Sequence, residues 1–366
     1  MKNRGRLYLY LAIACFIGLI VVFGANVYSN TLRDWAGKIK LTISPNYLDT
    51  EGWSKRVKFN ISGSSAGAQA NYQMKLTVHK DNGTAGSPNA NDVYFNNHCK
   101  DDFSDIRFTK SDGKTKLDYW IEEYTSGDNA IVWVEFDRIP ADPDTATFFI
   151  YYDNPDATSE SSGANTFLFF DDFASLDTEV WTVRAGYYSA SGGELYLGDN
   201  DGGGNARSYI AHLMTLPTNY RLHYRGKSTG TENEFVVYHT QDGNYLTTTD
   251  RLAWNDYGAS GSGATHCIYV GNSAYDNQDV PLVQNAYYNF RVTVLDKTYA
   301  FARYVDHTDT LVAESGYTDS ATRSRDSLGL HAYDYGTRTL VCDWIFVGNY
   351  VEPEPAFSSW GSEETA

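Results

Sequence analysis

The sequence predicts an all-β protein made of two consecutive β-sandwiches behind a single N-terminal transmembrane helix. Three observations lead to this fold class. Short segments of alternating apolar and polar residues recur along most of the chain, at the spacing typical of sandwich strands. The composition includes 29 Tyr, 8 Trp and 31 Gly, residues that favour strands and turns over helices. One uncharged apolar run occurs near the N-terminus, at residues 7–25.

Length and charge narrow the class of protein further. The 366 residues correspond to about two domains. The chain is 42% hydrophobic and 20% charged, which provides enough apolar surface to fold and excludes a disordered protein. The formal net charge of −17 repels nucleic acid and anionic lipid headgroups. We therefore expect no nucleic-acid partner.

The predicted membrane anchor occupies residues 1–28. Lys2, Arg4 and Arg6 precede the apolar run over 7–25. At about 1.5 Å per residue this run just spans a hydrocarbon core of ~30 Å, and the positive-inside rule keeps the basic stub in the cytoplasm. We expect a retained anchor and an extracellular remainder. A cleaved signal peptide and a processed pilin-like leader stay open as alternatives.

Residues 29–52 form a predicted connector that contains one strand, over 37–44. Its apolar residues Ile39, Leu41 and Ile43 alternate with polar ones, as in a half-buried strand. We expect this strand at the edge of the first sandwich. The alternative is donation of the strand to a neighbouring subunit, since strand addition is a common mode of association.

The first predicted β-sandwich covers residues 53–163. Six alternating segments follow one another there, separated by turn residues. Two of these segments are expected to face each other and to supply much of the core, with the side chains Leu117, Tyr119, Ile121, Val132, Val134 and Phe136. The small, polar stretch 156–164 that follows is typical of a linker.

The second predicted β-sandwich covers residues 164–362, and residues 363–366 form a tail. About ten to twelve strand-like segments follow one another over roughly 200 residues, which is the size of a jelly-roll sandwich. A long amphipathic helical pattern is missing from this part of the sequence. We therefore expect an all-β domain here too.

The first half carries four strings that resemble one family. They are Trp53-Ser-Lys-Arg56, HCKDDFSDIRFTKSDGKTKLDYWIE over 98–122, Val132-Trp-Val134 and FFIYYDNPDATSESSG over 148–163. The family is a β-sandwich domain of archaeal and bacterial surface proteins, of unknown function, that typically runs into a concanavalin A-like, laminin-G-like jelly roll. Segments 171–183 and 342–355 are similar to that jelly roll's opening and closing strands. The resemblance implies a surface location and carbohydrate contact or adhesion, with no established chemistry.

A Gly- and Ser-rich segment at 254–263 is the predicted ligand site of the jelly roll. It combines rings that can stack on sugar faces with planar polar groups that can bind hydroxyls. The predicted ligand-binding residues are Trp254, Asn255, Asp256, Tyr257, Tyr245 and Tyr275. The alternative is a surface loop whose aromatic residues fold back onto the sheet.

The acidic residues suggest an ion more than catalysis. Retaining glycosidases need two carboxylates about 5–5.5 Å apart, and the Glu-x-Asp-x-x-Glu pattern that would supply them on a strand is missing from the sequence. We therefore expect a protein that is not an enzyme. Asp171, Asp172 and Asp343 lie on the expected first and last strands of the jelly roll, where their oxygens would suit a structural calcium ion.

Modification sites and a disulfide are also predicted. The sequons at Asn60 and Asn82 are candidate glycosylation sites, and Asn82, which precedes Gly83 in a turn, is the better candidate. An exported location permits, but does not require, a disulfide between Cys267 and Cys342.

Together these features predict a non-catalytic cell-surface protein. It would bind glycans or other surface polymers through its jelly roll, for recognition or adhesion, and would require no cofactor beyond the calcium ion. One alternative is a structural subunit of a filament, surface layer or virion, assembled through the helix at 7–28 and the strand at 37–44. A second alternative is a polysaccharide-degrading enzyme.

Overall fold

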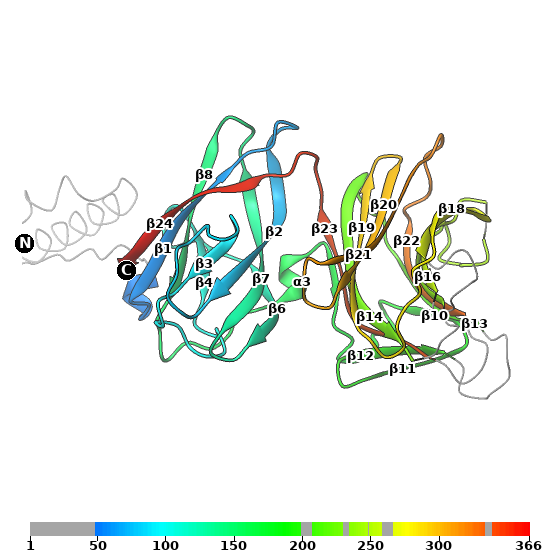
Figure 1. Cartoon of the computed structure of the whole chain (residues 1–366), viewed down its shortest axis with the longest axis horizontal. Coiled ribbons are helices and arrows are strands. Elements are labelled where there is room, and N and C mark those ends of the chain that lie inside the picture. The colour runs from blue at the N-terminus through cyan, green and yellow to red at the C-terminus, as the bar shows by residue number, and fades with distance from the viewer. Residues whose placement is uncertain (1–47, 199–206, 230–233, 248, 258–265, 334–338) are drawn as a thin grey trace, which may run out of the picture. The chain divides into compact units, whose positions relative to one another are not determined.

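The computed structural model describes residues 48–366 with internal gaps (Figure 1). The gaps are 199–206, 230–233, 248, 258–265 and 334–338. Over the described ranges, no helix is both long enough and apolar enough to cross a membrane. The predicted anchor and the predicted strand at 37–44 lie outside the described residues.

Residues 52–366 form one compact unit, and the short 3-10 helix η1 (Leu48–Glu51) belongs to the segment before it. The unit contains two sandwiches. The strands of the first are β1 (Lys55–Ser62), β2 (Gln69–His79), β3 (Asp92–Tyr94), β4 (Arg107–Lys110), β5 (Lys116–Leu117), β6 (Tyr119–Thr125), β7 (Asn129–Ile139), β8 (Thr145–Tyr152) and β24 (Ala356–Thr365). They form one sheet in the order β24-β1-β8-β4-β5 and another in the order β3-β2-β7-β6.

The core of the first sandwich confirms the alternation seen in the sequence. Along β7, buried and partly exposed residues alternate, and Val132, Val134 and Phe136 are all fully buried. In the pairing of β6 with β7, Tyr119 lies opposite Val134 and Ile121 lies opposite Val132. Because alternate residues of a strand point to the same face, these side chains point into the core as predicted. The two strands are neighbours in one sheet and do not face each other, and Leu117 lies on β5 of the other sheet.

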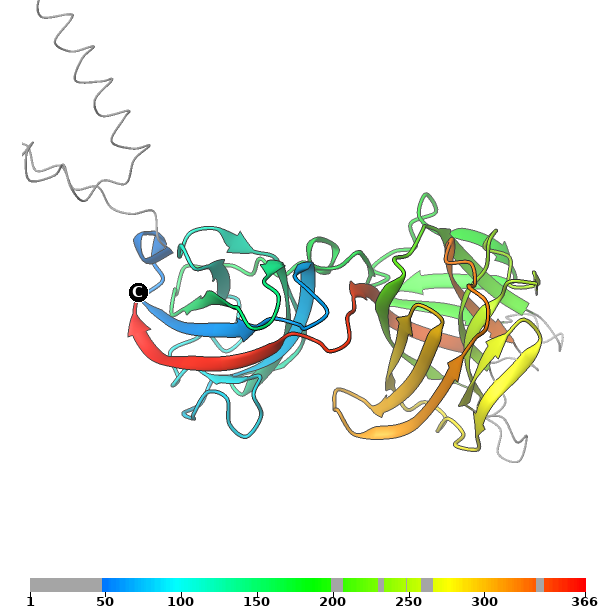
Figure 2. The ribbon, with the colours of Figure 1, turned by 90° about the horizontal axis from the view of Figure 1, so that it is seen from above.

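The last strand of the chain belongs to the first sandwich. Strand β24 pairs antiparallel with β1, and Figure 2 shows the two strands side by side. Phe357 and Trp360 pack on the buried Phe59, with ring centroids 5.9 and 5.1 Å away. Residues 356–365 are thus not part of the jelly roll or a tail, in contrast to the predicted boundary at 362. Strand pairing across some 300 residues leaves no local mark in a sequence.

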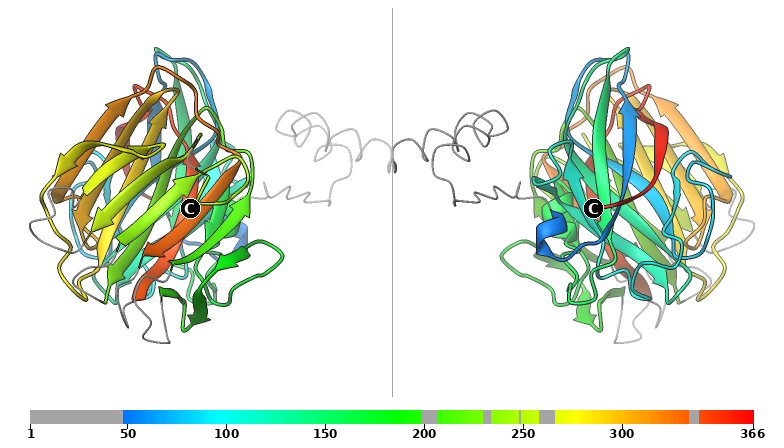
Figure 3. Two further views of the ribbon diagram at one scale, coloured as in Figure 1. Left: turned by 90° about the vertical axis from the view of Figure 1, so that its right-hand side faces the viewer. Right: turned by 90° about the vertical axis from the view of Figure 1, so that its left-hand side faces the viewer.

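The second sandwich is a jelly roll of two larger sheets (Figure 3). Its seven-stranded sheet comprises, in spatial order, β10 (Thr182–Ala185), β13 (Arg207–Leu213), β22 (Ser327–Tyr333), β15 (Glu234–His239), β16 (Leu252–Tyr257), β17 (His266–Val270) and β18 (Ser273–Gln278). Its second sheet comprises β11 (Tyr187–Ser191), β12 (Glu194–Gly198), β23 (Thr339–Asn349), β14 (Asn219–Ser228), β19 (Tyr288–Leu295), β20 (Thr298–Val305) and β21 (Leu311–Thr318), and β9 (Phe169–Asp171) pairs with β23. This is the all-β architecture that the sequence predicts.

The predicted linker at 156–164 is packed rather than free. Ser161 accepts a hydrogen bond from the backbone N–H of Ile121 at 2.8 Å, and Ser162 caps the short helix α3 (Gly163–Thr166). Phe167, directly after α3, stacks on Phe346 of β23 with ring centroids 3.9 Å apart. Aromatic residues of both sandwiches therefore meet at this connection, which the small, polar composition of the stretch does not indicate.

The two jelly-roll cysteines are not joined. Cys267 and Cys342 are buried, and the structure forms no disulfide between them. Cys267 lies on β17 of the seven-stranded sheet, whereas Cys342 lies on β23 of the other sheet. Facing sheets are about 10 Å apart, too far for the 4.4–6.8 Å between Cα atoms that a disulfide usually requires.

Candidate functional site

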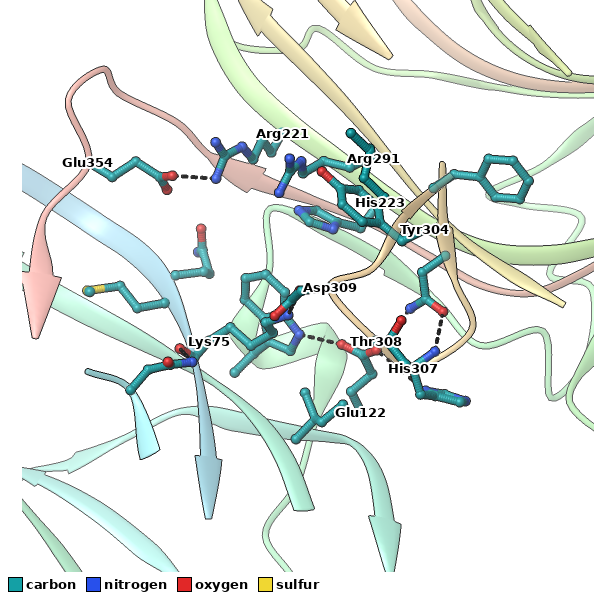
Figure 4. Close-up of a pocket in the computed structure, with 18 of the residues that line it drawn as sticks. Lys75, Glu122, Arg221, His223, Arg291, Tyr304, His307, Thr308, Asp309 and Glu354 are labelled. Atoms are coloured by element: carbon teal, nitrogen blue, oxygen red, sulfur yellow. Dashed lines mark hydrogen bonds and ion pairs between the residues drawn. The ribbon is translucent and has the colours of Figure 1, made fainter. Parts of the chain in front are cut away.

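A cavity of about 680 Å³ opens between the first sandwich and the sheet of the jelly roll that contains β14 (Figure 4). This volume lies in the range of roughly 300–1,000 Å³ that is typical of ligand sites. We call this cavity the groove and define it by ten of its lining residues. They are Lys75, Glu122, Trp133, Arg221, His223, Arg291, Tyr304, His307, Asp309 and Glu354.

Strand alternation places the polar wall of the groove on the jelly roll. Along β14, every second residue is buried in the core, so Arg221 and His223 point away from it. His223 pairs with Arg291 of β19, and paired residues of neighbouring strands share a face. The Arg291 guanidinium lies 4.7 Å from the centroid of the Tyr304 ring, on β20. Four side chains from three strands thus form this wall.

The opposite wall comes from β6 and β7 of the first sandwich. The carboxylate of Glu122 accepts a hydrogen bond from the Trp133 indole N–H at 2.7 Å and one from the Asn289 amide at 3.1 Å. Its side chain is only 5% exposed. Two donors thus satisfy a buried carboxylate and hold the Trp133 ring in place, which matters because an unpaired buried charge is costly.

Ion pairs connect the two walls. Lys75 of β2 pairs with Asp309 at 2.7 Å, and Arg221 pairs with Glu354 at 2.5 Å. The Tyr72 hydroxyl donates a second hydrogen bond to Glu354, at 2.8 Å. These contacts join the two walls through charged groups that already have partners within the chain.

His307 sits among carboxylates at the turn between β20 and β21. Its Nε2 lies 3.4 Å from Glu123 and 3.6 Å from Asp306, and its Nδ1 lies 3.8 Å from Glu122. Burial disfavours the charged imidazole, but the interactions with Glu122, Asp306 and Glu123 outweigh it and raise the pKa of His307. His307 therefore attracts a proton more readily than an ordinary histidine and can attach this turn to β6.

His223 behaves in the opposite way. Burial holds the pKa of His223 well below its usual value, and the positive charges of Arg291, Arg221 and Lys75 lower it further. Its ring stacks on Phe346 with centroids 4.8 Å apart and meets Trp133 edge to face. His223 is therefore a neutral, ring-shaped part of the wall at pH 7.

The predicted ligand residues do not line this groove. Trp254 and Asp256 are fully buried in the jelly roll, and Asn255 is nearly so. Asp256 binds His266 at 2.7 Å and also pairs with the buried Arg303. The prediction that this segment presents Trp254 and Asp256 to a ligand is wrong, because the segment is strand β16 in the middle of a sheet. The part at 258–263 and the side chain of Tyr257 lie outside the described residues.

The two remaining tyrosines also have partners within the jelly roll. Tyr245 is 8% exposed and stacks on His331 with ring centroids 3.8 Å apart. Tyr275 of β18 is half-buried and stacks on Tyr317 at 3.9 Å. Tyr245 thus packs back onto the sheet, as the alternative expectation for these aromatic residues had it.

The carboxylates predicted to bind calcium do not form a cluster. Asp171 accepts hydrogen bonds from the Trp181 indole at 2.6 Å and the Phe173 backbone at 2.8 Å, and Asp343 pairs with Arg225 at 2.6 Å. Asp172 is exposed. Among the described residues, no group of three or more His, Cys, Asp or Glu could hold a metal ion. Asp343 faces an arginine because the pairing of β14 with β23 is irregular beside Arg225.

The two sequons differ in accessibility. Asn82 is exposed in a bend, as a glycosylation site requires. Asn60 lies on β1, and its amide donates to Ser359 at 2.7 Å while its oxygen accepts from Thr147 at 2.7 Å. The side chain of Asn60 is thus engaged on both sides, and Asn82 remains the better candidate.

Sequence reasoning missed every residue of the groove. Arg221, His223 and Arg291 stand at outward positions of alternating strands, which is the pattern of any solvated face. Only the packing of the first sandwich over this face of the jelly roll turns it into one wall of a cavity. The sole signal in the sequence is the presence of three cationic or imidazole side chains on two strands of a strongly acidic chain.

Comparisons with known proteins find that part of the chain is similar to a family of unknown function. Residues 102–184 match the model of a domain of unknown function (DUF2341), in agreement with the resemblance of the first sandwich. An uncharacterized protein of Methanocaldococcus jannaschii, MJ1472, is 22% identical over 245 residues, which are 63% of this chain and 42% of that protein. The matched part is thus less than half of the relative's length.

Several solved structures are similar in fold. The Ca²⁺-bound exoplasmic/lumenal domain of VIP36 is 9% identical, with a TM-score of 0.40, over 51% of this chain and 94% of that one. Lectin II from Ulex europaeus is 7% identical (TM-score 0.37), and a β-1,3-glucanase from Mycobacterium marinum is 13% identical (TM-score 0.36); each covers 50% of this chain and 98% of its own. At these identities the likeness concerns the fold alone.

Proposed function

We propose that this protein is a non-catalytic cell-surface protein that binds glycans or other surface polymers in the groove between its two sandwiches. The observation that carries the proposal is the lining of the groove. Trp133 and Tyr304 supply ring surfaces, and Arg291 supplies a planar polar group. Rings and planar hydrogen-bonding groups in one cavity suit a ligand with both apolar faces and hydroxyl groups.

The state of the groove carboxylates favours binding over hydrolysis. Glycoside hydrolysis needs two carboxyl groups that are available to act as acid, base or nucleophile. Glu122, Glu354 and Asp309 are each engaged by hydrogen-bond donors or cations within the chain. Glu314 also lines the groove, and it accepts no hydrogen bond from the described residues. The other carboxylates of the lining are all engaged, so Glu314 lacks the second available carboxyl group that hydrolysis needs.

A glycan panel with a groove-filling variant tests the proposal. Thr308 is exposed and lines the groove, so Thr308→Trp should obstruct it. Thr322 is exposed in a loop that does not line the groove, and Thr322→Trp is the matched control. We expect the full-length protein to bind some saccharides of the panel, Thr308→Trp to lose that binding at least tenfold, and Thr322→Trp to retain it. No binding, or equal binding by both variants, would contradict the groove as the site.

A further inference from the structure

Arg291 differs from the other cations of the groove. It is half-buried on β19, and its contact is the ring of Tyr304 at 4.7 Å. Arg221 and Lys75 each have a carboxylate partner, at 2.5 and 2.7 Å, whereas within the described part of the chain no carboxylate lies within 4 Å of Arg291. A guanidinium carries five N–H donors in a planar fork that matches a carboxylate. Those donors face the groove without an acceptor from the described residues.

Other cations lie near Arg291, in a groove that is also lined by carboxylates. Its cross-strand partner is His223, whose pKa is lowered by burial and then by the charges of Arg291, Arg221 and Lys75. Arg221 and Lys75 are already paired with Glu354 and Asp309. Of these three cations, Arg291 is therefore the one whose charge is left to attract an anion.

Glu314 is the first acidic residue met when one follows the cross-strand pairs from Arg291, and it lies two strands away. Arg291 pairs with Ala302 of β20, and Ala302 pairs with Glu314 of β21. Two strand spacings separate the backbones of Arg291 and Glu314 by about 9.6 Å, and the methyl group of Ala302 fills little of that space. The exposed Glu314 forms no ion pair with Arg291. A space is thus left between the Arg291 guanidinium and the Glu314 carboxylate.

We infer that the groove selects acidic saccharides, and that Arg291 binds the carboxylate of a uronic acid residue. The inference rests on the proposed function and adds the class of ligand. Tyr304 supports the site, because its ring lies against the guanidinium and orients it. Glu314 acts as a negative neighbour that reduces the affinity for the acid and restricts the site to ligands that place their carboxylate at Arg291.

Calorimetric titration of the full-length protein tests this assignment. The probes are oligogalacturonate and oligomannuronate, each compared with its neutral, carboxyl-reduced form. We expect the acidic form of at least one probe to bind ten times more tightly or better. Arg291→Gln should weaken that binding by about 10- to 100-fold, the range for a hydrogen bond to a charged group, and should weaken the binding of the neutral form by a smaller factor.

Three further variants separate contact from general charge. Arg138→Gln removes the same charge from an exposed residue of β7 outside the groove and should change the affinity less than twofold. Arg291→Lys keeps the charge but not the planar fork, so it should lose part of the affinity. Glu314→Gln should strengthen the binding of the acidic form. Equal losses in Arg138→Gln and Arg291→Gln would overturn the assignment of Arg291.

The outcomes distinguish this inference from the proposed function. If neutral and acidic probes bind equally and Thr308→Trp abolishes both, the groove binds saccharides without selecting acids, and only the inference fails. If the protein binds no saccharide of either kind, the proposed function fails and the inference fails with it. Unchanged thermal unfolding of Arg291→Gln shows that a loss of binding does not come from misfolding.

Discussion

The outer faces of the two jelly-roll sheets differ in what covers them. On the seven-stranded sheet, the outer face is covered by the chain itself: Tyr238 and Tyr245 pack in a buried cluster, and Arg251 donates to the backbone of Tyr245 at 3.1 Å. On the sheet that contains β14, the outer face carries Arg221 and Arg291 and meets the first sandwich across a cavity. Similar strand alternation thus produces a filled face on one side and an open one on the other, and binding is expected at the open one.

Replacing Trp254 is expected to have the largest effect, because its side chain belongs to the core between the two sheets of the jelly roll and not to either outer face. Trp254 is fully buried and meets His239 edge to face at 4.9 Å. We expect Trp254→Ala to lower the free energy of unfolding by about 3–5 kcal/mol, the cost of deleting a large buried aromatic side chain, as measured by urea denaturation. The matched control is Tyr187→Ala, which truncates an exposed ring and should change stability by less than about 0.5 kcal/mol. A fully stable Trp254→Ala variant that had lost glycan binding would contradict a purely structural role for this core position.

Replacing Tyr245 tests whether the side chains that cover the outer face of the seven-stranded sheet have a purely structural role. Truncation to alanine removes the ring that stacks on His331 and lies 4.6 Å from the Arg251 guanidinium. We expect Tyr245→Ala to cost about 2–3 kcal/mol of unfolding free energy, less than Trp254 because the site borders the surface. Glycan affinity of the folded variant, measured by calorimetry, should equal that of the wild type. A loss of affinity larger than tenfold would show that the filled face takes part in binding.

The pH dependence of His307 tests the open side. The folded-state pKa of His307 is raised, so its contribution to stability is complete below its unfolded pKa of about 6.5 and is lost as the pH rises through the folded value. We expect wild type to exceed His307→Gln in stability by less than about 1 kcal/mol at pH 5.5, and the difference to vanish by pH 8.5. Denaturation curves of both proteins across this range measure it. A difference that grows with pH would contradict the arrangement around Glu122.

The smallest effect is expected for the ion pair that crosses the groove. Lys75 and Asp309 have side chains that are 30% and 79% exposed, and exposed pairs contribute little because water and salt screen them. A double-mutant cycle with Lys75→Ala and Asp309→Ala should give a coupling of about 0.5 kcal/mol or less, decreasing in 1 M salt. A coupling above 2 kcal/mol would mean that the walls are held together mainly by charge and not by the aromatic contacts around Phe346.

The sequence predicted the strands well and the site poorly. The cores of both sandwiches follow alternation, as the buried Val132 and Val134 illustrate, because the period of two is a local property of the chain. Trp254 stands in an equally regular strand. Its sequence neighbourhood, rich in Gly and Ser, indicated a loop, but the sheet on both sides of β16 makes it a core position.

What the sequence by itself determined is the class of the protein: all-β, acidic, with two sandwiches and outward-facing polar residues at every second position. Only the tertiary structure decided which of those outward faces stays open. It also decided that β24 completes the first sandwich and that Arg291 lacks a carboxylate partner among the described residues. The physical reason is that alternation sets the face on which a side chain lies, whereas the group that covers this face comes from residues far away in the chain, whose approach no local pattern encodes.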